Sequence, residues 1–183
     1  MLDEKKGARY ERCKKLMEQE HLDALIALSP ENVLYFAETY IQTQTSIRER
    51  LAIAIMPLES DPAIVACKIE QPTVDKETWI QDRRYYVELQ CSPIALMSEV
   101  IKEKKLENKR IGIELNYLMA TYYQELVDLL PRVEFVQCSR LFDQVRAIKE
   151  QREIKLLSYA GLQTVRSIEA AVKMTRVGDT END

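Results

Sequence analysis

Short apolar runs alternate with amphipathic segments along the whole chain. Six runs are short and rich in β-branched or aromatic residues, as buried strands are. Between them, apolar side chains recur every three or four positions, as they do on one face of a helix. This alternation predicts an α/β fold in which helices cover a sheet. The predicted strands are Ala24–Leu28, Leu51–Met56, Ala63–Cys67, Arg84–Leu89, Arg110–Glu114 and Val133–Val136.

Helix ends carry their own signals. Ser29-Pro30 and Ser92-Pro93 each combine a capping hydroxyl with a proline that suits a first helical turn. The last predicted helix begins near residue 150 and presents a single apolar stripe, and we expect Gly178 to end it. The other predicted helices cover residues 8–20, 33–36, 70–79, 94–105 and 117–130.

Residues 38–50 follow neither the helical nor the strand period. They predict a long polar loop that runs into the second strand, and such loops often carry function. The next two strands are joined by a connector that contains Pro57 and Pro62, which favours a hairpin.

Charge and glycine content exclude several classes of protein. The 183 residues include 30 acidic and 26 basic side chains, for a net charge of −4, so we expect no nucleic-acid partner. The four glycines are isolated, which leaves no glycine-rich phosphate-binding loop. The longest strongly apolar stretch covers residues 51–58, well short of the roughly 20 residues that span a bilayer, so we expect no membrane partner.

Cysteine and histidine usage limits the chemistry further. The four cysteines form no C-x-x-C pair, and no apolar leader opens the chain, so we expect buried free thiols and a cytoplasmic location. The single histidine, His21, has no partner pattern around it. We therefore expect it to lie at a helix end, and expect no histidine-based nucleophile or metal site in the chain.

Several motifs resemble the N-terminal domain of the creatinase, prolidase and aminopeptidase P family, and their order covers nearly the whole chain. Val177 replaces the proline usual in the last motif, and Glu150-Gln151-Arg152 replaces the common serine-containing link. The matching stretches are Leu22–Ile26 with Ser29–Val33 and Tyr35; Trp79, Asp82, Arg83 and Tyr85; Ile111–Glu114 with Leu118; Arg146–Lys149 with Glu153 and Ile154; and Arg176, Gly178, Thr180 and Glu181.

The resemblance implies a three-layer α/β/α fold with a mixed, about six-stranded sheet of the ribonuclease-H-like kind. It implies a creatinase/prolidase N-terminal domain over residues 1–148. Residues 149–183 would be a linker and the first helix of a truncated catalytic domain of the pita-bread fold. The catalytic residues would lie in that missing domain, together with two divalent metal ions (manganese, cobalt or zinc), so no cofactor is expected in this chain.

The function that the resemblance implies is that of a non-catalytic N-terminal domain of a Xaa-Pro metallopeptidase, either a dipeptidase or an aminopeptidase P. Its expected partners are its own C-terminal catalytic domain, a second copy in a homodimer, and a proline-containing peptide substrate. It would contribute to subunit association and to one wall of the substrate site. Two alternatives stay open: the N-terminal domain of a creatinase-like amidinohydrolase, and a free-standing oligomerisation module.

The resemblance also implies that the loop of residues 38–50 can reach a bound substrate, and it gives the candidate substrate-contact residues. By position, Arg50 and then Arg48 would grip a substrate carboxylate, and Tyr40 would form an aromatic wall. The alternative is that both arginines are surface charges paired with Glu49 or Glu38.

Two further groups admit a functional interpretation. The residues from Trp79 to Tyr86 combine aromatic and basic side chains as a nucleic-acid stacking platform would, but we expect Trp79 and Tyr85 to serve packing. Glu88, Glu114 and Asp128 are possible members of an acid-base carboxylate pair, although they belong to separate predicted elements.

Overall fold

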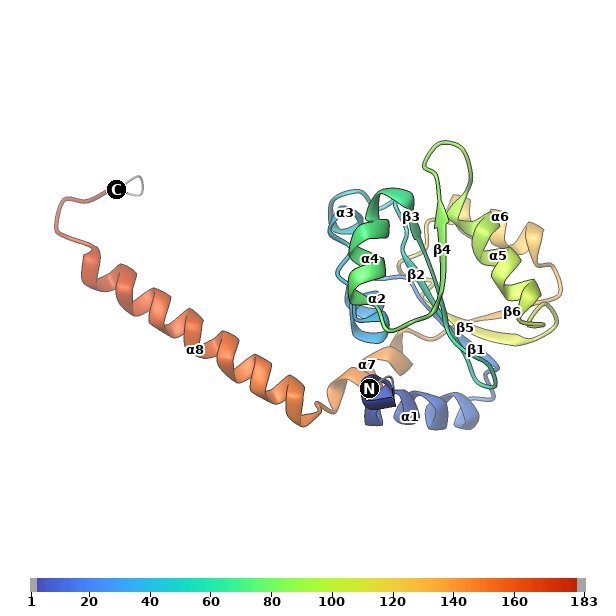
Figure 1. Ribbon diagram of the computed structural model, residues 1–183, viewed down its shortest axis with the longest axis horizontal. Helices are drawn as coiled ribbons and strands as arrows, with labels where there is room; N and C mark the ends of the chain where they lie inside the picture. The colour runs from blue at the N-terminus through green and yellow to red at the C-terminus, as the bar shows by residue number, and fades with distance from the viewer. Residues whose placement is uncertain (1–2, 181–183) are drawn as a thin grey trace. The chain divides into compact units, whose positions relative to one another are not determined.

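The computed structural model describes residues 3–180 and divides into two compact units, Met1–Ala147 and Ile148–Asp183. The first unit is built on a six-stranded mixed sheet with the order β4-β3-β2-β1-β5-β6 (Figure 1). The strands are β1 (Ala24–Ala27), β2 (Ile53–Pro57), β3 (Ala63–Cys67), β4 (Asp82–Tyr86), β5 (Arg110–Ile113) and β6 (Glu134–Gln137).

Strand direction decides which loops meet. β2 is antiparallel to both of its neighbours, β1 and β3, whereas the β3–β4, β1–β5 and β5–β6 pairs are parallel. Every strand except β2 therefore points the same way. The loops that follow β1, β3, β4, β5 and β6 lie at one edge of the sheet, which we call the carboxyl edge.

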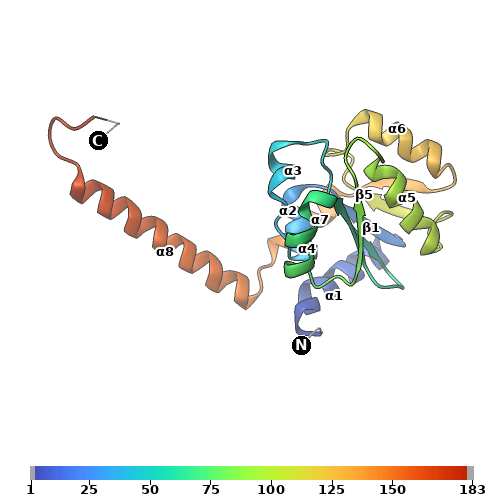
Figure 2. The same ribbon diagram turned by 45° about the horizontal axis from the view of Figure 1, so that its top comes forward.

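Helices cover both faces of the sheet, which gives the three layers of an α/β/α fold (Figure 2). On one face the core includes Phe36 and Phe142, whose rings meet edge to face at 5.4 Å between centroids. On the other face it includes Met97 and Ile101. The first face is covered by α1 (Asp3–Gln19), α2 (Pro30–Ala37), α4 (Gln71–Glu77) and α7 (Ser139–Ala147), and the second by α5 (Pro93–Glu103) and α6 (Ala120–Leu129).

The predicted sheet, its two helical layers and the hairpin of β2 and β3 are confirmed, but several boundaries are wrong. Residues 38–50 are not loop throughout, because Gln42–Ser46 form a short helix, α3. A single 3-10 turn, η1 (Lys68–Glu70), precedes α4. Helix α7 was not predicted, and α6 begins at Ala120 rather than at residue 117.

Strand β4 ends three residues earlier than predicted. It stops at Tyr86, and the backbone N–H of Val87 then donates to the Sγ atom of Cys91 across a turn. Leu89 lies within this turn with a left-handed φ of 64° and is fully exposed. The turn therefore pulls the chain out of the sheet where the sequence alone suggests that the strand continues.

The second unit contains one helix, α8 (Gln151–Met174), within its described residues. Glu150 and Glu153 form a capping box at its start. Its last residue is Met174 and Thr175 caps it, so the prediction that Gly178 ends the helix is wrong. An apolar stripe that includes Ile154, Val165 and Val172 has no other element of this unit to pack against.

Gly112 on β5 tests how tightly the first face is packed. A Cβ atom there would lie 2.6 Å from Leu25 Cδ2 and 3.1 Å from the Cβ atom of Cys138. We expect Gly112→Ala to lower the free energy of unfolding by about 1–3 kcal/mol, because a buried leucine must shift. Urea unfolding followed by circular dichroism measures this change.

Gly161 provides the control, because nothing lies within 4 Å of a Cβ atom added there. Gly161→Ala should stabilise helix α8 by roughly 0.5–1 kcal/mol and leave the unfolding of the first unit unchanged. Equal unfolding midpoints for Gly112→Ala and the unchanged chain would contradict the close packing at β5.

Candidate functional site at the carboxyl edge of the sheet

The sheet changes its winding direction between β1 and β5. From β1 the chain moves outward to β2, β3 and β4 on one side, and it returns to β5 and β6 on the other. The helix after β1, α2, packs on the first face, whereas the helix after β5, α6, packs on the second. In open α/β sheets, loops that part to opposite faces leave a crevice where ligands commonly bind. We call this place the switch point.

A buried carboxylate, Glu114, holds the switch point together. Its Oε2 accepts hydrogen bonds from the backbone N–H groups of Leu28 at 2.6 Å and Ser29 at 2.9 Å. Its Oε1 accepts from the hydroxyl of Ser29 at 2.9 Å and from Nδ2 of Asn32 at 2.6 Å. A residue at the end of β5 therefore fixes the turn from β1 into α2, and its charge is compensated by four donors.

The loop of residues 38–50 crosses the carboxyl edge and fills part of it. Gln44 on α3 is buried, and its Nε2 donates to the backbone oxygens of Leu28 at 2.5 Å and Ala52 at 3.5 Å. The backbone N–H of Thr43 donates to Glu70 Oε1 at 3.2 Å. Polar side chains make this segment look like a solvated loop, yet their hydrogen bonds tie it to the loops after β1 and β3.

Arg50 is paired with Glu88, the second residue after β4. Its Nε and Nη2 donate to the two carboxylate oxygens of Glu88 at 2.8 Å and 2.7 Å. The hydrogen bonds to Arg50 lower the pKa of Glu88, and those same bonds raise the pKa of Arg50. An ion pair was the expected alternative for Arg50, but the predicted partners were wrong, since Glu38 binds Arg9.

Arg48 lies at the switch point, and its side chain contacts a different loop from the one that Arg50 contacts. Its Nη2 donates to the backbone oxygens of Tyr117 at 2.8 Å and Asn116 at 3.5 Å. Its guanidinium carbon is 5.1 Å from the centroid of the Tyr117 ring. Arg48 thus contacts the loop after β5, and within residues 3–180 it forms no ion pair with a carboxylate.

Tyr40 occupies a third place. Its side chain is 49% exposed, and its backbone N–H donates to Glu77 Oε2 at 3.1 Å. The structure therefore places Tyr40 beside α4, Arg48 beside the loop after β5, and Arg50 beside the loop after β4. It brings Arg48 and Arg50 to loops of the carboxyl edge, whereas Tyr40 lies at the end of α4 that leads into β4. The three side chains are not gathered at one point, and their contact with a substrate stays a prediction.

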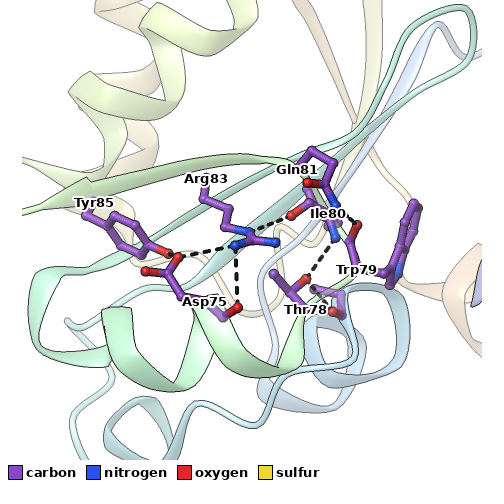
Figure 3. Close-up of polar contacts among 8 residues, drawn as sticks. Asp75, Thr78, Trp79, Ile80, Gln81, Arg83 and Tyr85 are labelled. Atoms are coloured by element: carbon purple, nitrogen blue, oxygen red, sulfur yellow. Dashed lines mark hydrogen bonds and ion pairs between the residues drawn. The ribbon is translucent and has the colours of Figure 1, made fainter. Parts of the chain in front are cut away.

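The aromatic and basic residues of β4 and its approach serve packing. Trp79 is buried, its Nε1 donates to the Phe36 oxygen at 2.8 Å, and its ring meets Tyr10 edge to face. Figure 3 shows Arg83 held between the Ile80 oxygen and Asp75, while the Tyr85 hydroxyl donates to Asp75 at 2.6 Å. Because these groups bind one another, they do not form an open stacking surface.

The remaining candidates stay separate. His21 is exposed and follows α1 with a left-handed φ of 53°. Glu88 binds Arg50, Glu114 binds the start of α2, and Asp128 accepts from Gln124, so these three carboxylates have separate partners. All four cysteines are free, as expected, but Cys91 is exposed rather than buried.

Two absences are established for residues 3–180. No three His, Cys, Asp or Glu side chains gather there in a group that could hold a metal ion. No helix in that range combines the length and the apolar character needed to cross a membrane.

Sequence reasoning missed the switch point itself. It depends on strand order, which periodicity along one chain does not reveal. A signal was present in Glu114, a carboxylate directly after an apolar strand, because such a residue needs donors close to where the strand ends.

The hydrogen bonds of Glu114 predict a large effect of a nearly isosteric substitution. Glu114→Gln would place an NH2 group either against the backbone N–H groups of Leu28 and Ser29 or against Nδ2 of Asn32, so we expect a loss of about 2–3 kcal/mol in the free energy of unfolding. Urea unfolding at pH 7 measures it. Glu125→Gln is the control, because Glu125 accepts one bond, from Ser92 near the surface, and should cost at most about 0.5 kcal/mol. Similar losses in the two variants would argue against the role of Glu114.

The Arg50–Glu88 pair predicts a pH effect with a defined sign. Because the pKa of Glu88 is lowered in the folded chain, the pair stabilises the fold above the ordinary glutamate pKa of 4.5 and loses this contribution as the pH falls through the lower, folded value. Arg50→Ala should raise the pKa of Glu88 toward 4.5, which a carboxyl ¹³C NMR titration measures. Arg84→Ala, which removes a different ion pair, should leave the Glu88 titration unchanged.

Comparison with known proteins identifies the family and the fold of the chain. The model of the Creatinase/Prolidase N-terminal domain matches residues 9–148. A curated relative, the uncharacterized hydrolase/peptidase y4tM of Sinorhizobium fredii, is 26% identical over 181 residues. That alignment covers 94% of this chain and 45% of the relative, so the chain spans about half the length of the curated relatives it matches.

Solved structures show the same fold. The X-Pro aminopeptidase from Thermotoga maritima is 16% identical with a TM-score of 0.76, over 93% of this chain and 45% of that one. The Xaa-Pro dipeptidase from Bacillus anthracis is 17% identical with a TM-score of 0.75, over 94% and 44%. The N-terminal domain of the cytoplasmic peptidase PepQ from Mycobacterium tuberculosis is 13% identical with a TM-score of 0.60, over 75% and 98%. With its fold, its motifs and the match to residues 9–148 in agreement, the chain belongs to the creatinase/prolidase N-terminal domain family.

Proposed function

We propose that this chain is the non-catalytic N-terminal domain of a Xaa-Pro metallopeptidase, either a dipeptidase or an aminopeptidase. The observation that carries the proposal is the family match over residues 9–148 in a chain that covers less than half of its curated relatives. Proteins named as a Xaa-Pro dipeptidase and an X-Pro aminopeptidase share its fold.

The metal chemistry of such a peptidase does not fit the residues of this chain. Within residues 3–180 no group of side chains offers a set of metal ligands. We assign the two divalent ions, whether manganese, cobalt or zinc, to the catalytic domain of the complete protein, and we assign residues 149–183 to the start of that domain.

The domain would then contribute to subunit association and form one wall of the substrate site. The loop of residues 38–50 is held by hydrogen bonds to Tyr117 and Glu88 at the carboxyl edge and to Glu77 at the end of α4, which supports a role in presenting side chains to a peptide. The apolar stripe of α8 finds no partner within its own unit, which supports a role in packing against the catalytic domain and in a homodimer. The free cysteines and the likeness to a cytoplasmic peptidase support a cytoplasmic location.

The proposal predicts activity that depends on the complete protein. We expect the complete protein, loaded with manganese, to hydrolyse Xaa-Pro dipeptides or Xaa-Pro-Yaa tripeptides, and the 183-residue chain to show no turnover under the same conditions. Release of the N-terminal amino acid is measured by chromatography. A matched dipeptide without proline is the control substrate.

Other outcomes would replace the proposal. Hydrolysis of creatine without added metal would favour the creatinase-like alternative. A gene that ends at codon 183, together with a stable oligomer of the chain in light scattering, would favour a free-standing oligomerisation module.

A further inference from the structure

The turn that follows β4 lies beside an apolar hollow bordered by carboxylates. We propose that this hollow docks a basic segment of a partner protein, in which an apolar side chain is flanked by lysine or arginine. The inference goes beyond the proposed function, because it concerns a protein partner rather than a peptide substrate. Three observations support it: the exposure of the turn, the lining of the hollow, and the charge around it.

The turn of residues 87–92 projects from the carboxyl edge of the sheet (Figure 1). It carries two apolar side chains in solvent, because Leu89 is fully exposed and Val87 is 40% exposed. Every position of the inner strands β2 and β3 is buried, by contrast. Large apolar side chains that face solvent beside a hollow are typical of contact surfaces, since a partner that covers them removes apolar area from water.

The hollow beside this turn has a volume of about 460 Å³. Much of its lining is contributed by Tyr86, Leu89, Pro93 and Tyr122. The Tyr86 hydroxyl donates to the Leu51 oxygen at 3.0 Å, and the Tyr122 hydroxyl donates to the backbone oxygen of Glu49 at 3.1 Å. Because both hydroxyls are already bound, the two tyrosines offer the hollow mainly their rings. The wall therefore suits an apolar side chain.

The carboxylates of Glu49, Glu88 and Glu125 border the hollow, and we call them the acidic rim. None of the described residues that line the hollow is basic. Burial, and then the charges of the acidic rim, raise the pKa of the Tyr122 hydroxyl. The three carboxylates thus act on one side chain of the wall, although they come from three different segments of the chain.

The carboxylates of the acidic rim differ in how far their charge is compensated. Both oxygens of Glu88 accept hydrogen bonds from Arg50, which neutralises most of its charge. Glu125 accepts one hydrogen bond from the uncharged hydroxyl of Ser92, at 2.8 Å. Within residues 3–180 neither Glu125 nor Glu49 forms an ion pair. The acidic rim therefore keeps two negative charges that attract a cation.

Charge complementarity selects the occupant of the hollow. Nucleic acids and anionic lipid surfaces carry negative charge, which the acidic rim repels. A metal ion would leave the apolar wall unused, and residues 3–180 contain no group of side chains that could hold one. A polypeptide segment can satisfy both parts of the surface, with an apolar side chain in the hollow and lysine or arginine beside Glu49 and Glu125. The hollow is therefore assigned to a basic segment of another protein.

Binding is tested on the 183-residue chain with three fluorescein-labelled hexapeptides. Lys-Lys-Leu-Leu-Lys-Lys carries both features, Lys-Lys-Ser-Ser-Lys-Lys lacks the apolar pair, and Glu-Glu-Leu-Leu-Glu-Glu reverses the charge. We expect fluorescence anisotropy to show that the first peptide binds about tenfold more tightly than either of the others. None of them contains proline, so the result does not depend on peptidase activity. Equal affinity of the first peptide and either of the others would overturn the inference.

A charge variant locates the binding at the acidic rim. Glu49→Gln combined with Glu125→Gln should weaken binding of the basic leucine peptide by about tenfold, because it removes the two uncompensated charges. Glu18→Gln combined with Glu59→Gln is the matched control, since it changes the net charge equally at exposed positions outside the hollow. This control should leave the affinity unchanged. Equal losses in the two double variants would show attraction to the net charge alone and would overturn the inference.

A second variant tests the apolar part of the surface. Leu89→Asn removes the exposed apolar side chain, and asparagine tolerates the left-handed φ of 64° at this position, so the fold should be kept. We expect the variant to bind the basic leucine peptide about fivefold more weakly. Its urea unfolding midpoint should be no lower than that of the unchanged chain. An unchanged affinity for the peptide would overturn the inference.

Cys91 reports where the peptide binds. It lines the hollow and is exposed, whereas the other three cysteines are buried, so iodoacetamide should alkylate Cys91 first. The basic leucine peptide, at about ten times its Kd, should slow this alkylation by about tenfold, because it covers the thiol. The serine peptide at the same concentration should leave the rate nearly unchanged. Binding of the leucine peptide without protection of Cys91 would place it elsewhere and overturn the inference.

Two further outcomes would identify a different occupant. Peptide binding that is present in the 183-residue chain but absent from the complete protein would show that the catalytic domain covers the hollow. Self-association of the unlabelled chain in light scattering, abolished by Leu89→Asn, would show that a second copy covers it. Either result would overturn the assignment to a partner protein.

Discussion

The hydrogen bonds around Glu114 connect the parts of the sheet that the rest of the first unit depends on. The Glu114 carboxylate, at the end of β5, accepts hydrogen bonds from the backbone N–H groups of Leu28 and Ser29, which follow β1. It also accepts one from the side chain of Asn32 in the first turn of α2. A buried charge of this kind tolerates only a structure that satisfies it, because any opening of the β1–β5 pair would leave it without donors. The two parallel strands and the start of α2 are thereby kept in one register. The loop of residues 38–50 then settles against a fixed edge, with Gln44 reaching the oxygen of Leu28 directly beside the Glu114 donors.

Two arginines of that loop look alike in the sequence but differ in whether an ion pair neutralises their charge. Arg48 and Arg50 are two positions apart in a polar segment, and nothing in their neighbourhood distinguishes them. The fold directs Arg50 toward Glu88 and Arg48 toward the backbone of Asn116 and Tyr117. One arginine ends in an ion pair and the other ends against carbonyl oxygens and an aromatic face. Strand order, rather than local sequence, creates this difference.

The inner strands could be predicted from their apolar runs because β1, β2 and β3 are buried along their whole length. Strands β2 and β3 are buried at every position, so their apolar runs were unambiguous. The end of β4 was misjudged because Val87 and Leu89 are apolar yet exposed, and the bond from Val87 to Cys91 that ends the strand is invisible in a pattern of polarity. Helix α3 was missed for the opposite reason, since a run of Gln, Thr and Ser has no apolar face, and its buried member is an amide held by hydrogen bonds. Arg48 and Arg50 were assigned to the correct loop, but their partners come from loops some 40 to 70 residues away along the chain.

Strand β4 borders the sheet, and its composition bears on how the chain avoids sticking to other chains. Its central residues, Arg83 and Arg84, are engaged with Asp75 on one side and with Asp82 and Glu103 on the other. A foreign strand that added to this border would have to strip water from these charges, which makes such an addition unfavourable. The charged edge strand therefore disfavours aggregation of chains through edge-to-edge strand pairing.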